Sequence, residues 1–246
     1  MNVAEQLLRA FAITKKDLLI YYMRGPVIIQ GLLIPAFLFI TFYFRRSLPI
    51  EFVIPGVLGM ALFFSVSAIT PVIAPWETRM KTFERLVSAP IYLWAIILGD
   101  IIASAAFGLL ITSLILLVAV VLLGPGILTL PLIAGMIIAA FCFSSLGTLI
   151  SAPPADNPSN IMLFATLIKF PIIFISGIFV SIAEMGSYRI LSFFSPLTYF
   201  TDLARHSIQG AGYLSSAVDL EVLLAFTLLF FISSVKWHSK SLSRRF

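Results

Sequence analysis

Residues 101–123 form an unbroken run of uncharged, mostly apolar side chains. A helix of that length crosses the roughly 30 Å hydrocarbon core of a bilayer. Comparable runs occupy residues 26–44, 52–75, 127–150 and 161–182, and the last of these contains one charged residue, Lys169. A soluble domain carries roughly 25% charged residues, whereas this chain carries 11% and is 60% hydrophobic. The sequence therefore predicts an all-α integral membrane protein, with residues 1–246 as a single transmembrane domain.

A sixth, weaker span is predicted near the end of the chain. Its uncharged stretch covers only residues 222–235. The helix must therefore extend through Asp219 and Glu221, or lie in a thinned bilayer. We predict six transmembrane helices in all, the third beginning near Ile91.

The N-terminal segment, residues 5–23, is amphipathic. Five of its apolar side chains share one stripe of a helical wheel, namely Leu8, Phe11, Leu18, Leu19 and Tyr22. Such a helix lies in the membrane interface. The alternative is the polar start of the first span, but the Gly25-Pro26 pair separates the two segments, which favours an interfacial helix.

Basic residues predict the orientation of the chain. With six spans, eleven Lys and Arg residues lie on the side of the termini and four lie on the other, which are Arg45, Arg46, Arg189 and Arg205. The positive-inside rule then makes both termini cytoplasmic in a multi-pass protein of the cell membrane. The net charge of +5 is small for a nucleic-acid binder, and no nucleic-acid partner is expected.

Residues 76–90 form a charged segment between the second and third spans, on the cytoplasmic side of this topology. Trp76, Met80, Phe83 and Val87 recur at helical spacing and predict one apolar stripe on a short helix. This stripe could be buried against the bilayer surface or in a groove of a cytoplasmic partner. The residues alone do not separate these two readings.

Motifs for catalysis are absent from the sequence. There is no phosphate-binding Gly-rich loop, no His-Glu-x-x-His zinc motif and no Gly-x-Ser-x-Gly nucleophile turn. His206 and His238 stand alone, and His238, in a basic tail, is expected to be solvated. We predict no catalytic residue, no metal site and no cofactor bound by this chain.

Two charged residues are expected within the spans. A cation at membrane depth costs about 2.5–3.5 kcal/mol and usually faces a bundle interior or a cavity. Lys169 is interpreted as lining a pathway or forming an ion pair at a dimer interface, and the alternative is that it snorkels to the interface. Asp100, near the start of its span, could line the pathway or take an interfacial, cap-like position.

Two stretches carry a family resemblance. Residues 79–104 and residues 170–205 resemble two patterns of the type-two ABC exporter permeases, at Arg79, Thr82, Glu84, Leu86, Pro90, Leu98 and Gly99 in the first, and at Pro171, Phe174, Ser176, Gly177, Phe179, Pro196, Leu197, Thr198, Tyr199, Asp202 and Arg205 in the second. The chain departs from the family at Asp100, Lys169 and Val180-Ser181, which leaves the substrate class open.

The resemblance implies an exporter subunit rather than an enzyme, moving a lipid-like, drug-like or other amphipathic substrate. ATP and Mg²⁺ would bind a separate ABC ATPase subunit, and the permease would form a homodimer or a heterodimer with a related permease. Residues 76–90 would be the coupling helix and residues 183–217 a re-entrant outer segment. ATPase-coupling contacts are expected at Trp76, Arg79, Met80, Phe83, Glu84 and Arg85, and pathway-lining positions at Lys169, Phe174, Ser176 and Asp100.

Two other classes remain as alternatives. An intramembrane lipid-modifying enzyme would use Asp100, Lys169, Asp202 or His206, but enzymes of that kind cluster such residues and here they are scattered. An ion-coupled secondary transporter would need acidic residues deep in the spans, where only Asp100 comes near.

Overall fold

A computed structural model describes residues 2–46, 49–155 and 157–242, apart from a number of side chains between residues 26 and 46. Every regular element in these ranges is helical. In chain order the helices are α1 (Val3–Asp17), η1 (Leu18–Tyr22), α2 (Gly25–Arg46), α3 (Ile50–Val66), α4 (Thr70–Arg79), α5 (Thr82–Ser88), α6 (Leu93–Leu123), η2 (Pro125–Ile127), α7 (Leu130–Ile150), α8 (Pro158–Ile175), η3 (Ile182–Glu184), η4 (Gly186–Tyr188), α9 (Arg189–Ser192), α10 (Pro196–Gln209) and α11 (Ser216–Ser241).

Five helical segments of the described chain are long and apolar enough to cross a membrane: Ile50–Arg79, Leu93–Leu123, Leu130–Ile150, Pro158–Ile175 and Ser216–Ser241. This confirms the all-α membrane class. The first predicted span, residues 26–44, falls within α2, where part of the side chains lies outside the described set. The count of six spans therefore stays a prediction.

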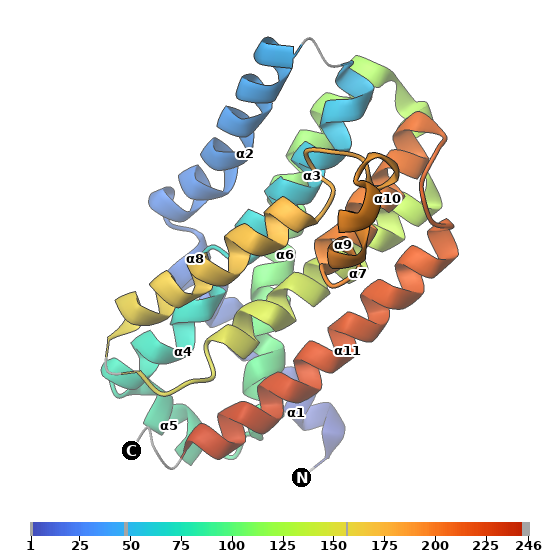
Figure 1. Cartoon of the computed structure of the whole chain (residues 1–246). Helices are drawn as coiled ribbons and strands as arrows, with labels where there is room; N and C mark the ends of the chain where they lie inside the picture. Colours follow the sequence, from blue (N-terminus) through green and yellow to red (C-terminus); the bar gives the residue numbers. More distant parts are fainter. Residues whose placement is uncertain (1, 47–48, 156, 243–246) are drawn as a thin grey trace.

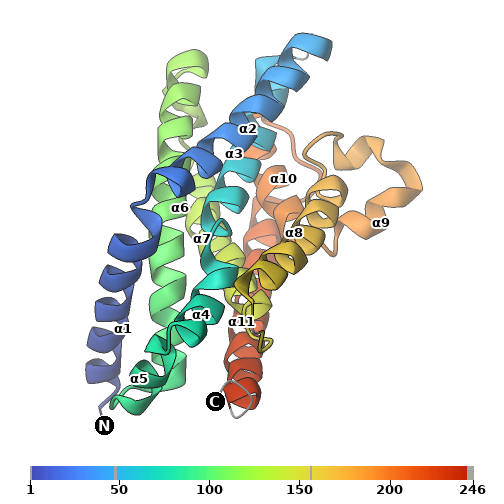
Figure 2. The same ribbon diagram turned by 90° about the vertical axis from the view of Figure 1, so that its left-hand side faces the viewer.

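α3 occupies the middle of the bundle. It packs against α2, α6, α7 and α10, and Figures 1 and 2 show these helices around it. Phe63 of α3 meets Phe143 of α7 edge to face, with ring centroids 5.1 Å apart. By contrast, most of the apolar window of α6, α8 and α11 remains unburied within the chain. Such large apolar faces suit contact with lipid tails or another transmembrane chain.

α11 is longer than its apolar run suggests. It covers 26 residues, or roughly 39 Å at the helical rise, and includes both Asp219 and Glu221. The helix therefore extends through these two acids, while the depth of the acids in the bilayer stays a prediction. The start of α1 and the end of α11 lie at the same end of the bundle (Figures 1 and 2).

The predicted outer segment, residues 183–217, folds into short helices followed by α10. α10 packs against α3, α7 and α11, and its residues 196–205 are all buried. Asp202 accepts hydrogen bonds from the backbone N–H groups of Tyr213 and Leu214, at 2.9 and 2.7 Å. The guanidinium of Arg205 lies 4.8 Å from the ring centroid of Phe52. These two motif residues therefore hold the α10 region together, while re-entry into the membrane stays a prediction.

Candidate functional site

The segment predicted as one coupling helix is an elbow of two helices. α4 ends at Arg79 and α5 begins at Thr82. Between them Lys81 adopts a left-handed conformation, with φ of 55°, which breaks a helix because L-residues disfavour it. The hydroxyl of Thr82 donates to the carbonyl of Glu77 at 3.2 Å and fastens the turn. The prediction of a continuous helix over residues 76–90 is therefore wrong.

The break also divides the predicted apolar stripe. Phe83 is only 2% exposed and lies in a cluster with Ala74 and Ile96. Its side chain is thus not free to dock into another protein, contrary to our prediction. Met80, at the bend, is 74% exposed, and Trp76 is partly exposed beside Tyr21, with ring centroids 6.1 Å apart.

The outer surface of the elbow is charged. Arg79, Lys81, Glu84 and Arg85 are all exposed, and Met80 lies among them in the sequence. Phe83 fixes α5 from inside, so that this surface is presented in one orientation. A small apolar contact surrounded by charges is the kind of surface that a protein partner recognises.

α1 is fastened to the elbow at its beginning. Gln6 is fully buried; its amide nitrogen donates to the carbonyl of Pro90 at 3.3 Å, and its amide oxygen accepts from the N–H of Tyr92 at 2.8 Å. One side chain thus satisfies two backbone groups in the connection between α5 and α6. Neither composition nor periodicity indicates this role, because glutamine is normally an exposed residue.

A close helix contact holds the middle of α1. The hydroxyl of Thr14 donates to the carbonyl of Gly99 in α6 at 3.0 Å. A Cβ atom at Gly99 would lie 2.6 Å from Cβ of Ile13 and 2.7 Å from the carbonyl oxygen of Ala10. Only glycine therefore permits this approach of α1 to α6.

A buried charge cluster fastens the end of α1. Nζ of Lys16 pairs with Asp17, at 2.9 Å, and with Glu77 of α4. The hydroxyl of Tyr21 reaches Glu77 at 3.5 Å. Burial lowers the pKa of Lys16, but the carboxylates of Asp17, Asp100 and Glu77 outweigh this effect and hold the pKa above its usual value. Lys16 therefore stays charged at neutral pH.

Asp100 lies near this charge cluster, in the contact between α1 and α6. It is buried in α6, which packs along α1, and it acts electrostatically on Lys16. An interfacial or pathway-lining position of Asp100 stays a prediction.

Lys169 lies on α8 with its side chain 9% exposed, and its ammonium donates to the carbonyl of Ser67. That carbonyl lies in the break between α3 and α4. In a continuous helix it would accept the N–H of residue 71, which is a proline and has none. Lys169 therefore satisfies a backbone group that Pro71 leaves unpaired, and no acidic partner of Lys169 was found within the described ranges.

The four residues predicted to line a pathway do not form one site. Phe174 is 65% exposed and lies against Phe170 and Phe179, at centroid distances of 6.5 and 5.7 Å. Ser176 is fully buried and donates to the carbonyl of Ile173 at 2.7 Å. Asp100 lies at the junction with α1. A role for these side chains in a transport pathway stays a prediction.

His238 was expected to be solvated, and this is wrong. Its ring is buried in α11, with Nε2 3.3 Å from the hydroxyl of Ser151 and Nδ1 3.0 Å from the carbonyl of Ser234. It joins the end of α7 to α11. Among the residues that the structure describes, no group of three or more His, Cys, Asp or Glu side chains could hold a metal ion.

A comparison with protein families gives one match. The model of the family described as ABC-2 type transporter matches residues 9–208, a range that includes Lys16, Gly99 and Lys169 and all of α10 except Gln209, but not Gln6. No curated protein matches the chain.

Proposed function

Because this chain belongs to the ABC-2 type transporter family, we propose that it exports an amphipathic, lipid-like or drug-like substrate from the cytoplasm, using ATP hydrolysed on a separate subunit. Membership makes it a multi-pass membrane protein and the permease subunit of an ABC transporter, with nucleotide binding left to a partner. We place the ATP and its Mg²⁺ on that partner, and we propose that two permease chains, identical or related, assemble with it in the cell membrane.

The observation that carries this proposal is that side-chain contacts hold the elbow between α4 and α5 firmly against its neighbouring helices. Its charged surface around Met80 is exposed, while Phe83, Gln6 and Lys16 tie it to α1, α4 and α6. A partner that moves the elbow would therefore move these three helices together. This is the mechanical property that coupling to a separate ATPase requires.

The direction of insertion is also supported. The start of α1 and the end of α11 lie at one end of the bundle (Figures 1 and 2), which supports the even number of crossings that we predict. The elbow lies at that same end (Figure 2). With the excess of basic residues there, we propose that this end is cytoplasmic.

A pair of surface substitutions tests the proposal. Met80→Glu places an acid at the centre of the elbow surface, where the native side chain is exposed, so that the chain should still insert. Tyr188→Glu is the matched control, since Tyr188 is similarly exposed and lies in η4, in the segment between α8 and α10. Each variant is purified from native membranes and probed with a photoreactive ATP analogue.

We expect Met80→Glu to lose the copurifying ATP-binding subunit and Tyr188→Glu to retain it. If both variants retain the subunit at the wild-type ratio, the elbow is not the coupling surface. If the wild-type chain brings down no ATP-binding subunit, the ATP-driven exporter is rejected.

A further inference from the structure

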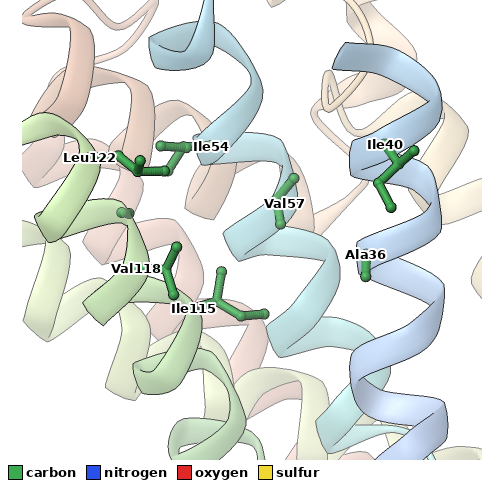
Figure 3. Close-up of a pocket in the computed structure, with 8 residues that line it drawn as sticks. Ala36, Ile40, Ile54, Val57, Ile115, Val118 and Leu122 are labelled. Carbon is green, nitrogen blue, oxygen red and sulfur yellow. The ribbon is translucent and has the colours of Figure 1, made fainter. Parts of the chain in front are cut away.

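An apolar crevice of about 430 Å³ lies between α2, α3 and α6. Figure 3 shows the side chains of α2, α3 and α6 that line it. Its floor is made by Ile54 and Val57 of α3, which are buried. Its rim includes exposed side chains of α2 and α6, namely Ala36, Ile40, Val118 and Leu122.

The lining limits what the crevice can hold. All the lining residues are aliphatic, so that none of their side chains offers a hydrogen bond. A bound water needs two to four polar partners, and a sugar or peptide group would lose its hydrogen bonds to water without replacement. An unfilled crevice forfeits dispersion contacts along its walls. The occupant must therefore be a hydrocarbon.

The helices around the crevice indicate which kind of hydrocarbon occupies it. The floor belongs to the candidate span Ile50–Arg79 and one wall to the candidate span Leu93–Leu123. The rim is continuous with the exposed outward face of α6, including Leu117 and Val121. The crevice thus opens toward the bilayer, whose core contains lipid chains and no water.

We propose that this crevice binds one acyl chain of a membrane phospholipid, which enters between α2 and α6 and rests on α3. The chain would fill the space between these helices and so fix the distance of α2 from α6. The proposal goes beyond the transport function and needs no ATPase partner. A side chain from a second permease copy is the competing occupant.

Photolabelling of the reconstituted full chain tests this. The probe is a vesicle of phosphatidylcholine in which one acyl chain carries a diazirine near its middle, and labelled positions are mapped by mass spectrometry. We expect Ile54 and Val57 to be labelled although they are buried within the chain, because an inserted acyl chain reaches them. Leu62, on the same helix and fully buried, is the background position.

A substitution at the rim gives the matched comparison. Ala36→Phe should fill the crevice and reduce labelling of the floor several-fold, and Val118→Phe should do the same if Ala36→Phe does not insert. Ala106→Phe, at an exposed position of α6 outside the crevice, should leave floor labelling unchanged.

The proposal is overturned if Ile54 and Val57 are labelled no more than Leu62. It is also overturned if the rim variants label like the wild type. Efficient crosslinking of Ile40→Cys between two copies, with an unlabelled floor, would assign the crevice to the second permease chain.

Discussion

Lys169 of α8 donates a hydrogen bond to the carbonyl of Ser67, a residue 102 positions away in the sequence. The carbonyl is available because Pro71 cannot supply the N–H that a continuous helix would provide. One structural unit therefore combines Lys169, the break between α3 and α4, and Pro71.

This unit predicts a coupling between positions 169 and 71. Lys169→Met removes a cation that costs about 2.5–3.5 kcal/mol to place in a membrane, but leaves a carbonyl unpaired at about 1–3 kcal/mol. These two free-energy changes nearly cancel, so that the stability of Lys169→Met alone does not test the contact with Ser67. In a Pro71→Ala background the new N–H can take the Ser67 carbonyl, and Lys169→Met should be more favourable there by about 1 kcal/mol.

The measurement is a double-mutant cycle of unfolding free energies in detergent. Leu167→Met, an exposed neighbour on α8, should show no coupling to Pro71→Ala. Equal effects of Lys169→Met in both backgrounds would show that the Ser67 contact does not contribute to stability.

Phe83 should be an anchor of the elbow rather than of an interface. Phe83→Ala leaves a cavity beside Ala74 and Ile96 and should destabilise the isolated chain by about 3–5 kcal/mol. Met80→Ala, at an exposed position, should change stability by less than about 0.5 kcal/mol. Thermal unfolding of the two purified variants distinguishes them, and a Phe83→Ala chain as stable as the wild type would contradict the observed packing.

Gly99 should control the distance between α1 and α6. Gly99→Ala brings a Cβ within 2.6 Å of Cβ of Ile13, and such overpacking costs about 1–3 kcal/mol. α1 should move outward, so that maleimide labelling of a cysteine at position 13 becomes faster. Gly126→Ala is the control, since nothing lies within 4 Å of its added Cβ; similar labelling rates in both would argue against a tight α1–α6 contact.

Lys16 should stabilise the contact between α1 and α4. Its contribution to the free energy of unfolding should not vary near neutral pH. Lys16→Met leaves Asp17 and Glu77 without their cation and should cost about 1–3 kcal/mol, because Lys16 is only partly buried. Lys16→Arg should retain most of the stability.

The pH dependence follows from the raised pKa of Lys16. A lysine whose pKa is higher in the folded state contributes its full stability below the unfolded value of about 10.4. The stability difference between wild type and Lys16→Met should therefore be flat from about pH 6 to 9, and should shrink as the pH rises above about 10.4. A difference that already shrinks below pH 9 would show that the ion pairs are not what stabilises the junction.

The sequence predicts most of the helices that can cross a membrane, because the apolar runs at residues 52–75, 101–123, 127–150 and 161–182 are long enough to need one. The run at residues 222–235 is too short by itself, and α11 reaches its full length only by including Asp219 and Glu221. It does not predict the elbow. Trp76, Met80 and Phe83 keep helical spacing through the bend, and the left-handed Lys81 carries no signal that periodicity can detect.

The contacts of single polar residues could not be predicted either. The partners of Gln6, Lys169 and His238 lie 86, 102 and 87 positions away in the sequence. A lone buried polar side chain has the same local sequence whether its partner is an acid, a carbonyl or water. Its role depends on which helices become neighbours, and that is decided by packing of the whole bundle.

The separation between Gln6 and Tyr92 also affects how the chain is made. Synthesis proceeds from the N-terminus, so α1 leaves the ribosome long before the residues that will fasten it exist. During that interval the membrane surface is where its exposed Leu8 and Phe11 can be buried. Docking of α1 must then wait for α6, so that α1 reaches its final position only after several later helices have been synthesised.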